Sequence, residues 1–341
     1  MLTSSSTISV PMRYVCGLVD AAASRGVSSD DLLAWASIDR GLLDLPKGRV
    51  SLKQFSRLYG GIVAALEDEG LGLQDCPSRP GSSEMLCRIG VTTSTFADCA
   101  SVVARGCNVV MGGFKVECIS NGGELQISFR ERDPTLRERE LAFEIVLLMI
   151  YSIMSWLVGQ RLPLVSADFP YPPPRHLFEL RALLGGRLRF NQPHAALRFS
   201  GVVKNLQIVR SAEDIPRFIR RAPASFIEAL VVRDSLAFEV RRVLQQALPE
   251  LLSLIQVAER LAVSRRTLHR KLEASGASFQ GIKDDLRRDI ALNLLTRSAT
   301  PLKQIAETLG FSDQSTFQRA FAEWTGVPPG EYRKRTQHPN D

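Results

Sequence analysis

Apolar residues in the C-terminal third of the chain recur at helical spacing in two places. Leu268 and Leu272 are four positions apart, and Phe317 and Phe321 have the same spacing. Residues three or four positions apart lie on one face of an α-helix. The pattern therefore predicts two helices, each with a buried apolar stripe and with the intervening residues facing outward.

These apolar pairs belong to an internal repeat formed by residues 257–272 and 305–321. Four positions align directly: Ala258 with Ala306, Glu259 with Glu307, Leu261 with Leu309 and Ser264 with Ser312. The second copy then has one inserted residue. After it, Leu268 aligns with Phe317 and Arg270 with Arg319. Each copy reads as a short helix, a turn and a second helix, the arrangement that places a helix in a DNA major groove.

The turn of each copy has its own chemistry. Gly310 stands where the turn needs a left-handed residue, a conformation that glycine adopts without steric cost. Ala262 occupies the same place in the first copy, so that turn is expected either to carry strain or to have a different conformation. Ser264 and Ser312 are predicted to cap the second helix of each copy.

The outward residues of the second helices are the candidate DNA contacts: Arg265, Arg266, His269, Arg270, Gln314, Ser315, Thr316, Gln318 and Arg319. Arginine pairs with guanine edges and glutamine with adenine edges. A helical hairpin that binds protein through a solvated polar face is the alternative, and the tandem copies favour DNA.

Residues 234–335 resemble the DNA-binding domain of the AraC/XylS family of bacterial transcription regulators, and residues 310–333 match its most diagnostic stretch. The resemblance implies seven helices, in which a long helix near 279–296 joins two helix-turn-helix subdomains. It implies double-stranded operator DNA and RNA polymerase as partners, and it places base contacts on Arg266, His269, Arg270, Gln314, Ser315, Gln318 and Arg319. Ala262 departs from the glycine that is commoner in the family.

Residues 1–222 have a different pattern, which predicts an α+β domain with a small sheet. Helical periodicity is expected over 12–23, 30–36, 52–66 and 96–104. The Asn121-Gly-Gly turn between two alternating segments predicts a β-hairpin. Further strands are expected over 164–169, 187–190 and 196–199. The fold class is thus an α+β domain followed by an all-α domain of two helix-turn-helix subdomains and a long joining helix.

Leu141–Val158 is the most apolar stretch, and its length is borderline for a membrane helix. Glu144 lies inside it and charged residues precede it, so a central buried helix without a membrane is predicted. Glu144, Ser152 and Ser155 would then need buried partners or a ligand. Glu144 is read either as a first-turn residue favoured by the helix dipole or as a weak candidate for contact with an effector.

The front part resembles the arabinose-binding-type N-terminal domain of AraC-family regulators, as found in ornithine-utilisation regulators. The resemblance rests on residues 26–33, 42–46, 169–174, 183–190 and 197–199, and on the long apolar helix. It implies a sensor for an unidentified small-molecule effector and a self-association surface, hence a homodimer, without implying that arabinose is bound. Activation is the mode that the family favours.

The length of 341 residues suggests two domains. We expect an effector-binding and dimerisation domain over 1–222, a linker over 223–233, a DNA-binding domain over 234–336 and a tail over 337–341. The net charge is +7, but 16 basic and 13 acidic residues follow position 233, so the charge is not concentrated there. A moderate salt dependence of DNA binding is therefore predicted.

The cysteines indicate neither a metal site nor a disulfide framework. All six lie in the first 118 residues, without a C-x-x-C pair or a nearby histidine. Reduced thiols in a cytoplasmic protein are expected, with a redox switch as the alternative, and no cofactor is predicted. The start of the chain lacks the pattern of a secretory signal.

Two other classes of function compete with that of a regulator. A DNA-targeted enzyme, such as an alkylation-repair protein, would need a reactive cysteine setting that these spacings do not supply. A Ser-His-Asp set is also hard to assemble from the four scattered histidines, so no catalytic residue is expected. A ligand-independent architectural DNA-binding protein is the other alternative.

Overall fold

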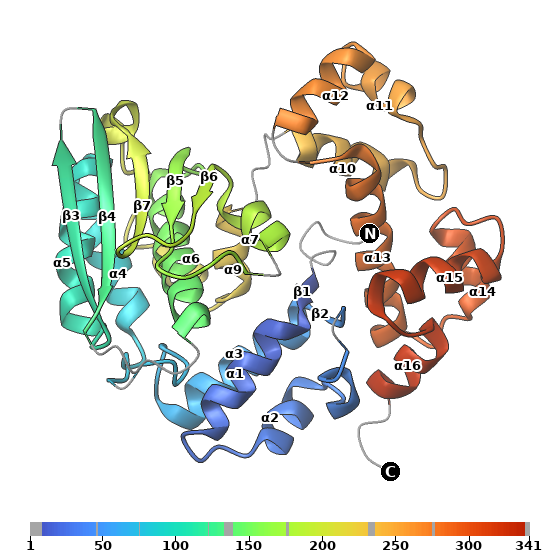
Figure 1. Cartoon of the computed structure of the whole chain (residues 1–341), viewed down its shortest axis with the longest axis horizontal. Helices are drawn as coiled ribbons and strands as arrows, with labels where there is room; N and C mark the ends of the chain where they lie inside the picture. Colours follow the sequence, from blue (N-terminus) through green and yellow to red (C-terminus); the bar gives the residue numbers. More distant parts are fainter. Residues whose placement is uncertain are drawn as a thin grey trace. The chain divides into compact units, whose positions relative to one another are not determined.

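The computed structural model describes residues 9–45, 47–74, 76–121, 123–132, 139–174, 177–230, 236–274 and 277–337. The chain divides into two compact units, drawn in Figure 1. Unit 1 comprises Met1–Cys16, Asp30–Leu58 and Val232–Asp341, and unit 2 comprises Gly17–Ser29 and Tyr59–Val231. These units are discontinuous, unlike the contiguous stretches predicted from the sequence, because N-terminal segments group with the C-terminal helices.

Among its described residues between 236 and 337, unit 1 contains seven helices, as the family resemblance implied. They are α10 (Leu236–Ala247), α11 (Leu254–Arg260), α12 (Arg265–Ala274), α13 (Phe279–Arg297), α14 (Leu302–Thr308), α15 (Gln314–Thr325) and α16 (Pro329–Gln337). The predicted joining helix is α13, which Ser278 caps by accepting a hydrogen bond from the Gly281 amide. Ile290 and Leu295 of this helix are buried and supply the core between the two helix-turn-helix subdomains.

A short two-stranded ribbon from the start of the chain also belongs to unit 1. Strand β1 (Ser9–Pro11) pairs antiparallel with β2 (Arg49–Ser51). Ser9 donates a hydrogen bond of 2.5 Å from Oγ to Asp289 Oδ1 on α13. Tyr332 Oη on α16 donates to the carbonyl oxygen of Arg49 over 2.7 Å. These side-chain bonds attach the ribbon to the C-terminal helices.

The remaining N-terminal helices agree with their predicted ranges. They are α1 (Met12–Ala23), α2 (Ser29–Ala36) and α3 (Leu52–Leu66). Ser51 Oγ accepts a bond from the Gln54 amide at the start of α3, as a helix cap does. The chain passes from unit 1 to unit 2 within α1 and again within α3.

Unit 2 is built on a five-stranded sheet with the strand order β3-β4-β7-β5-β6. The strands are β3 (Phe114–Asn121), β4 (Glu124–Glu131), β5 (Leu164–Asp168), β6 (Arg187–Arg189) and β7 (Ala195–Ser200). The β3–β4 hairpin and the three later strands confirm the predictions from alternation. Leu125, Ile127 and Phe129 of β4 are buried on one face of the sheet, and the alternate residues lie on its other face.

Helices α5 (Phe96–Val110) and α6 (Arg139–Val158) pack on the apolar face of this sheet, and α4 (Ser82–Gly90) packs on both helices. Helices α7 (Leu177–Leu184), α8 (Ile215–Ile219) and α9 (Ala224–Leu230) also belong to the unit. Residues 224–230 were predicted as linker, which is wrong, because α9 buries Phe226 and Leu230 and packs on α6. The predicted tail, apart from Gln337 at the end of α16, lies outside the described residues.

Helix α6 is the central helix of the unit. It is long and apolar enough to cross a membrane, but 78% of its apolar window is buried inside the fold, so it is a core helix. Its polar side chains have the buried partners that the sequence required: Ser152 Oγ donates to the Leu148 carbonyl, and Ser155 Oγ accepts from the Leu162 amide. Because α6 begins at Arg139, Glu144 lies in its second turn and not in its first.

The cysteines of the described residues are free thiols. Cys99 and Cys107 are buried, and burial raises the pKa of each thiol to about 12. Since the thiolate is the reactive form, these groups are unreactive at neutral pH. Within the ranges that the structure describes, no group of three or more His, Cys, Asp or Glu side chains is placed to hold a metal ion.

Candidate nucleic-acid interface

The first helix-turn-helix consists of α11 and α12. Val257, Leu268 and Leu272 are buried between the two helices, as their spacing predicted. Ser264 caps α12, because its Oγ accepts a 3.1 Å hydrogen bond from the Thr267 amide. Ala262 has a φ of +54°, so the turn keeps the left-handed geometry and carries the strain that was one of the two alternatives.

The second helix-turn-helix consists of α14 and α15. Gly310 has a φ of +69°, as predicted for its place in the turn. The predicted cap at Ser312 is wrong: Asp313 caps α15, accepting a 2.8 Å bond from the Thr316 amide. The inserted residue of this copy shifts the cap by one position. Hydrogen bonds from the Thr316 amide and the Ser312 hydroxyl lower the pKa of Asp313 to about 2.

The candidate residues on α12 share one exposed face. Arg265, Arg266, His269 and Arg270 are all exposed, opposite the buried leucines. His269 Nδ1 lies 3.2 Å from Glu273 Oε2 one turn later. This face combines three guanidinium groups, which are suited to paired hydrogen bonds with guanine.

The candidate residues on α15 divide into two groups. Gln314, Ser315 and Arg319 are exposed and Gln318 is half-buried, so these four side chains are accessible to a DNA groove in which the helix lies. Thr316 instead serves the helix cap: its Oγ1 donates to Asp313 Oδ2 over 2.8 Å. Its hydroxyl is therefore already engaged, which the sequence pattern did not show.

Arg287 is a positioning residue that the sequence analysis missed. It lies on α13, is 8% exposed, and donates a 3.0 Å hydrogen bond from Nε to the Leu309 carbonyl at the end of α14. Its guanidinium carbon lies 3.4 Å from the ring centre of Phe311, a cation–π contact. Arg287 thus joins the long helix to the turn of the second helix-turn-helix.

Glu144, the weak candidate for effector contact, is fully buried on α6. Tyr171 Oη donates to its Oε1 over 3.3 Å. Tyr171 in turn lies in an aromatic cluster with Phe143, Phe169 and Phe190. This environment gives Glu144 a role in the core of unit 2, and an effector contact stays a prediction.

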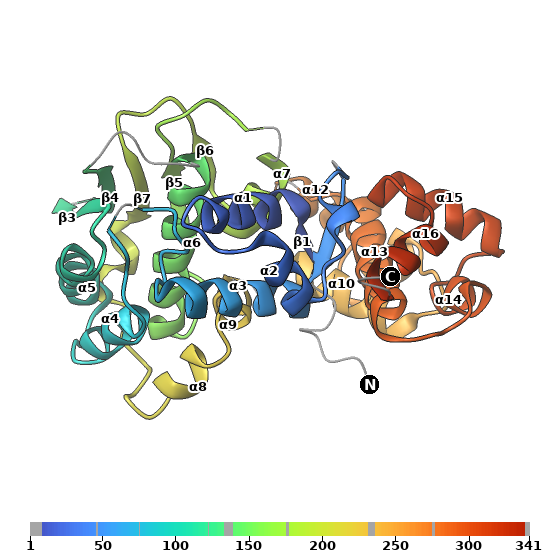
Figure 2. The same cartoon turned by 90° about the horizontal axis from the view of Figure 1, so that it is seen from below.

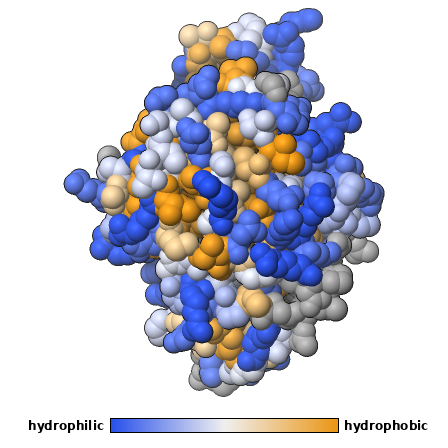
Figure 3. Space-filling model, turned by 90° about the vertical axis from the view of Figure 1, so that its left-hand side faces the viewer, coloured by the Kyte–Doolittle hydropathy of each residue, from blue (hydrophilic) through white to orange (hydrophobic). Residues whose placement is uncertain are grey.

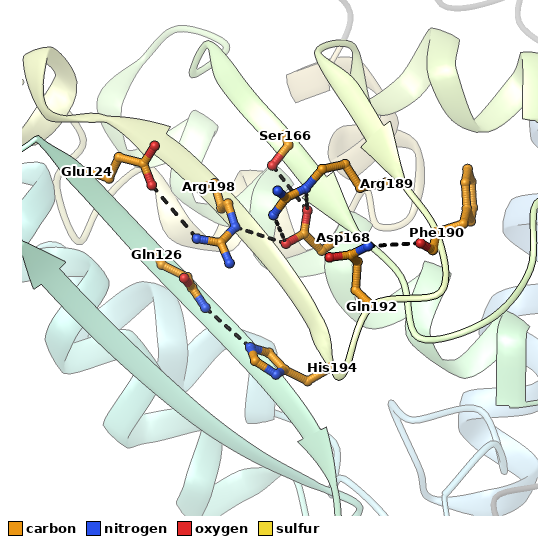
Figure 4. A network of polar contacts seen from close by, with 9 residues as sticks. All are labelled: Glu124, Gln126, Ser166, Asp168, Arg189, Phe190, Gln192, His194 and Arg198. Atoms are coloured by element: carbon orange, nitrogen blue, oxygen red, sulfur yellow. Dashed lines mark hydrogen bonds and ion pairs between the residues drawn. The ribbon is translucent and has the colours of Figure 1, made fainter.

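A second buried carboxylate organises the polar face of the sheet, shown in Figure 4. Asp168 on β5 is 2% exposed and accepts bonds of 2.7 and 2.5 Å from Arg189 on β6. Arg198 on β7 donates to it over 2.9 Å and Ser166 over 3.1 Å. Burial alone would raise the pKa of Asp168, but the bonds from Arg189 and Arg198 outweigh it and lower the pKa. The network ties together three strands.

Asp168→Asn is expected to lower the free energy of unfolding by about 1.5–3 kcal/mol at neutral pH, the range for hydrogen bonds to charged groups. Because the folded-state pKa is lowered, the ionised carboxylate stabilises the fold above the unfolded pKa of about 3.9, and this stabilisation is lost as the pH falls through the folded value. Urea unfolding should therefore show a constant deficit between about pH 5 and 7 that shrinks below about pH 4. Asp20→Asn, at an exposed position of α1, is the control. A deficit that persists undiminished at acid pH would contradict this role.

Comparison with known proteins places this geometry in a family. A family model described as the arabinose-binding N-terminal domain of AraC transcription regulators matches residues 26–205, and a helix-turn-helix domain model matches residues 257–335. The ornithine utilization regulator of Pseudomonas aeruginosa is 30% identical over 326 residues, which cover 95% of this chain and 96% of that protein.

Two further proteins are similar to this chain over a shorter stretch or at lower identity than the ornithine utilization regulator. The transcriptional activator RclR of Escherichia coli is 34% identical over 85 residues, 25% of this chain and 29% of RclR. The structure of the transcriptional regulator CdpR from Pseudomonas aeruginosa aligns with 81% of this chain and 90% of its own at 19% identity, with a TM-score of 0.32. The family-model matches and the full-length relative are decisive: the chain belongs to the AraC family of DNA-binding transcription regulators.

Proposed function

We propose that this regulator activates transcription in the cytoplasm when unit 2 binds a small-molecule effector. The observation that carries the proposal is the pairing of an arabinose-binding-type region with two helix-turn-helix subdomains in one chain. The exposed arginines of α12 and the exposed polar residues of α15 read operator bases. RNA polymerase is the second macromolecular partner, because an activator of this kind acts by contact with the transcription machinery.

Self-association is part of this proposal. Unit 2 exposes Val109 at the end of α5 and Ile119 on β3, which are 80% and 46% accessible to solvent. Figure 3 looks at the side of the molecule on which α5 and β3 lie, and apolar groups gather there among polar ones. Exposed apolar patches mark association sites. We infer that two copies associate through the surface that contains Val109, at the C-terminal end of α5, and Ile119 on the edge strand β3.

Packing of α5 is favoured over addition of a strand to the sheet edge. The outward-facing main-chain groups of Val116 on β3 are engaged: its amide donates to Asn108 Oδ1 over 2.9 Å, and its carbonyl accepts from Asn108 Nδ2 over 2.6 Å. Arg132 Nε donates to the Phe114 carbonyl of the same strand. Such contacts protect an edge strand from pairing with another chain.

Reciprocal titration tests the effector-dependent function. If effector binding favours the conformer that binds DNA, operator DNA must tighten effector binding by the same factor, typically about 5- to 150-fold. A screen of metabolites by thermal shift would first identify a ligand, since a ligand of the native state raises apparent stability. Isothermal titration with and without operator DNA then measures the factor. Equal effector affinities in both titrations would contradict control of DNA affinity by the effector. They would favour an architectural role, or control of a later step such as contact with RNA polymerase.

A further inference from the structure

Unit 2 contains a cavity between α4, α5, α6 and the loop that follows α3. These helices lie side by side in Figures 1 and 2. The cavity is partly open to solvent: its volume is about 400 Å³ when the open solvent at its mouth is included, and about 20 Å³ of it admits the centre of a water-sized group. That smaller space holds one water-sized group, so a larger ligand would extend along the open part. The apolar side chains that line it are Leu73, Leu86, Val110, Met111, Ala142, Ile145, Val146 and Met149.

The loop that forms the polar side of the cavity is held by Asp68. This carboxylate is 3% exposed and accepts main-chain bonds of 2.7 Å from Gly70, 2.9 Å from Gly72 and 2.6 Å from Ser78. Leu71 has a left-handed φ of +59°, an unfavourable conformation for a residue with a side chain. Such strain persists only where surrounding contacts determine the backbone, and it concentrates at binding sites.

Ser78 is the group that points to a ligand. It lines the cavity, is 5% exposed, and its hydroxyl oxygen has no hydrogen-bond partner in the part of the chain that the structure describes. Its main chain is fixed in both directions, because its amide donates to Asp68 and its carbonyl accepts a 2.6 Å bond from the Glu69 amide. A buried hydroxyl without a partner is unfavourable. A bound molecule would relieve that cost.

The charges around the cavity restrict the ligand. Glu69 lines it and caps α4, accepting 2.7 Å bonds from the Gly81 and Ser83 amides. Among the residues that the structure describes, the cavity lining contains this carboxylate and no lysine, arginine or histidine. The positive end of α4 is therefore already occupied by Glu69, and a carboxylate ligand would meet a like charge without a cation to balance it.

We propose that this cavity is the effector site and that it takes a small molecule with a hydrocarbon body and one uncharged or cationic hydrogen-bonding group, which pairs with the Ser78 hydroxyl. The inference rests on the proposed function, in which unit 2 binds an effector. The hydrocarbon body packs between Leu86 on α4 and Met149 on α6.

Three probes of one chain length test the ligand class. 1-Hexanol, hexylamine and hexanoate are titrated into the full-length protein, and the thermal unfolding midpoint is followed. The alcohol and the amine are expected to raise the midpoint in a concentration-dependent way, and the carboxylate is expected to leave it unchanged. An equal response to hexanoate, or no response to any probe, would overturn the proposed ligand class.

Ser78→Ala separates binding from structure. Removal of an unpartnered hydroxyl is expected to leave the free protein as stable as the wild type or more so, and to weaken hexanol binding about tenfold, the factor for one lost hydrogen bond. Ser94→Ala, at an exposed position before α5 and outside the cavity lining, is the control and should change neither property. Unchanged hexanol affinity in Ser78→Ala would contradict the site.

Ala142→Trp tests the cavity in a second way by filling it from α6. The variant should lose the responses to hexanol and hexylamine, whereas Val202→Trp, at an 86% exposed position, should keep them. The metabolite that regulates DNA binding by the wild type is then tested on both variants. A metabolite that still controls DNA binding by folded Ala142→Trp would overturn this site and leave the proposed function standing. Absence of any metabolite effect on the wild type would count against the proposed function itself.

Discussion

Arg270→Ala and Arg319→Ala are each expected to weaken binding to the cognate operator by about 1–3 kcal/mol, roughly 5- to 150-fold. Both guanidinium groups are exposed on the outward faces of α12 and α15. A base-reading arginine makes two hydrogen bonds to one guanine, and alanine removes both. Binding to random DNA should change much less, because it depends on the number of phosphate contacts. Fluorescence anisotropy with cognate and scrambled duplexes measures both quantities.

Lysine at the same positions sharpens this test. Arg270→Lys and Arg319→Lys keep the positive charge but lose the planar, two-pronged donor. They should lose operator affinity much as alanine does and retain binding to random DNA. For the alanine variants, Arg88→Ala controls for the loss of one positive charge, because Arg88 is an exposed arginine on α4 that pairs with Glu84. Equal losses on operator and random DNA would show that the two arginines contact only phosphates.

Gly310→Ala is expected to destabilise the second helix-turn-helix by about 2–5 kcal/mol, from a left-handed alanine and from overpacking. A Cβ atom there would lie 2.2 Å from the Pro249 carbonyl oxygen and 2.8 Å from Leu251 Cγ, in addition to the φ of +69°. Main-chain atoms cannot yield as a flexible side chain does. Chemical denaturation should show the loss, and operator binding should fall with it.

The reverse change in the first turn is the matched control. Ala262→Gly removes the cost of a left-handed alanine, about 1–2 kcal/mol, and adds the entropy cost of glycine, about 0.5–1 kcal/mol. We therefore expect unchanged stability or a gain of up to about 1.5 kcal/mol. A loss of stability in Ala262→Gly, or none in Gly310→Ala, would show that the two turns do not share the geometry described above.

The sequence predicted the elements that have a long, regular pattern. The apolar pairs of α12 and α15, the hairpin turn at Asn121 and the apolar run of α6 each extend over enough residues to fix the element type. The ribbon of β1 and β2 was missed, because three residues per strand carry no detectable alternation. Its position depends on tertiary bonds such as that from Ser9 to Asp289, which no local pattern encodes.

The exposure of most candidate DNA contacts could be predicted because exposure on a helix follows from its periodicity. The shift of the cap from Ser312 to Asp313 followed from one inserted residue, and it also explains why Thr316 serves the cap. The role of Arg287 was not predicted, because an arginine on a helix ordinarily faces water. Here its guanidinium lies over the Phe311 ring and donates a hydrogen bond to the Leu309 carbonyl. The cavity at Ser78 combines residues from four segments, which only the fold brings together.

The central claim is that both recognition helices read bases in one binding event. Selection of a random duplex library with the full-length protein, followed by methylation interference on the selected sequence, tests it most directly. Two helices in successive major grooves predict two patches of guanines, about 10 base pairs apart, whose methylation blocks binding. Arg270→Lys should erase one patch and Arg319→Lys the other. A single patch, or loss of the same patch in both variants, would contradict the claim.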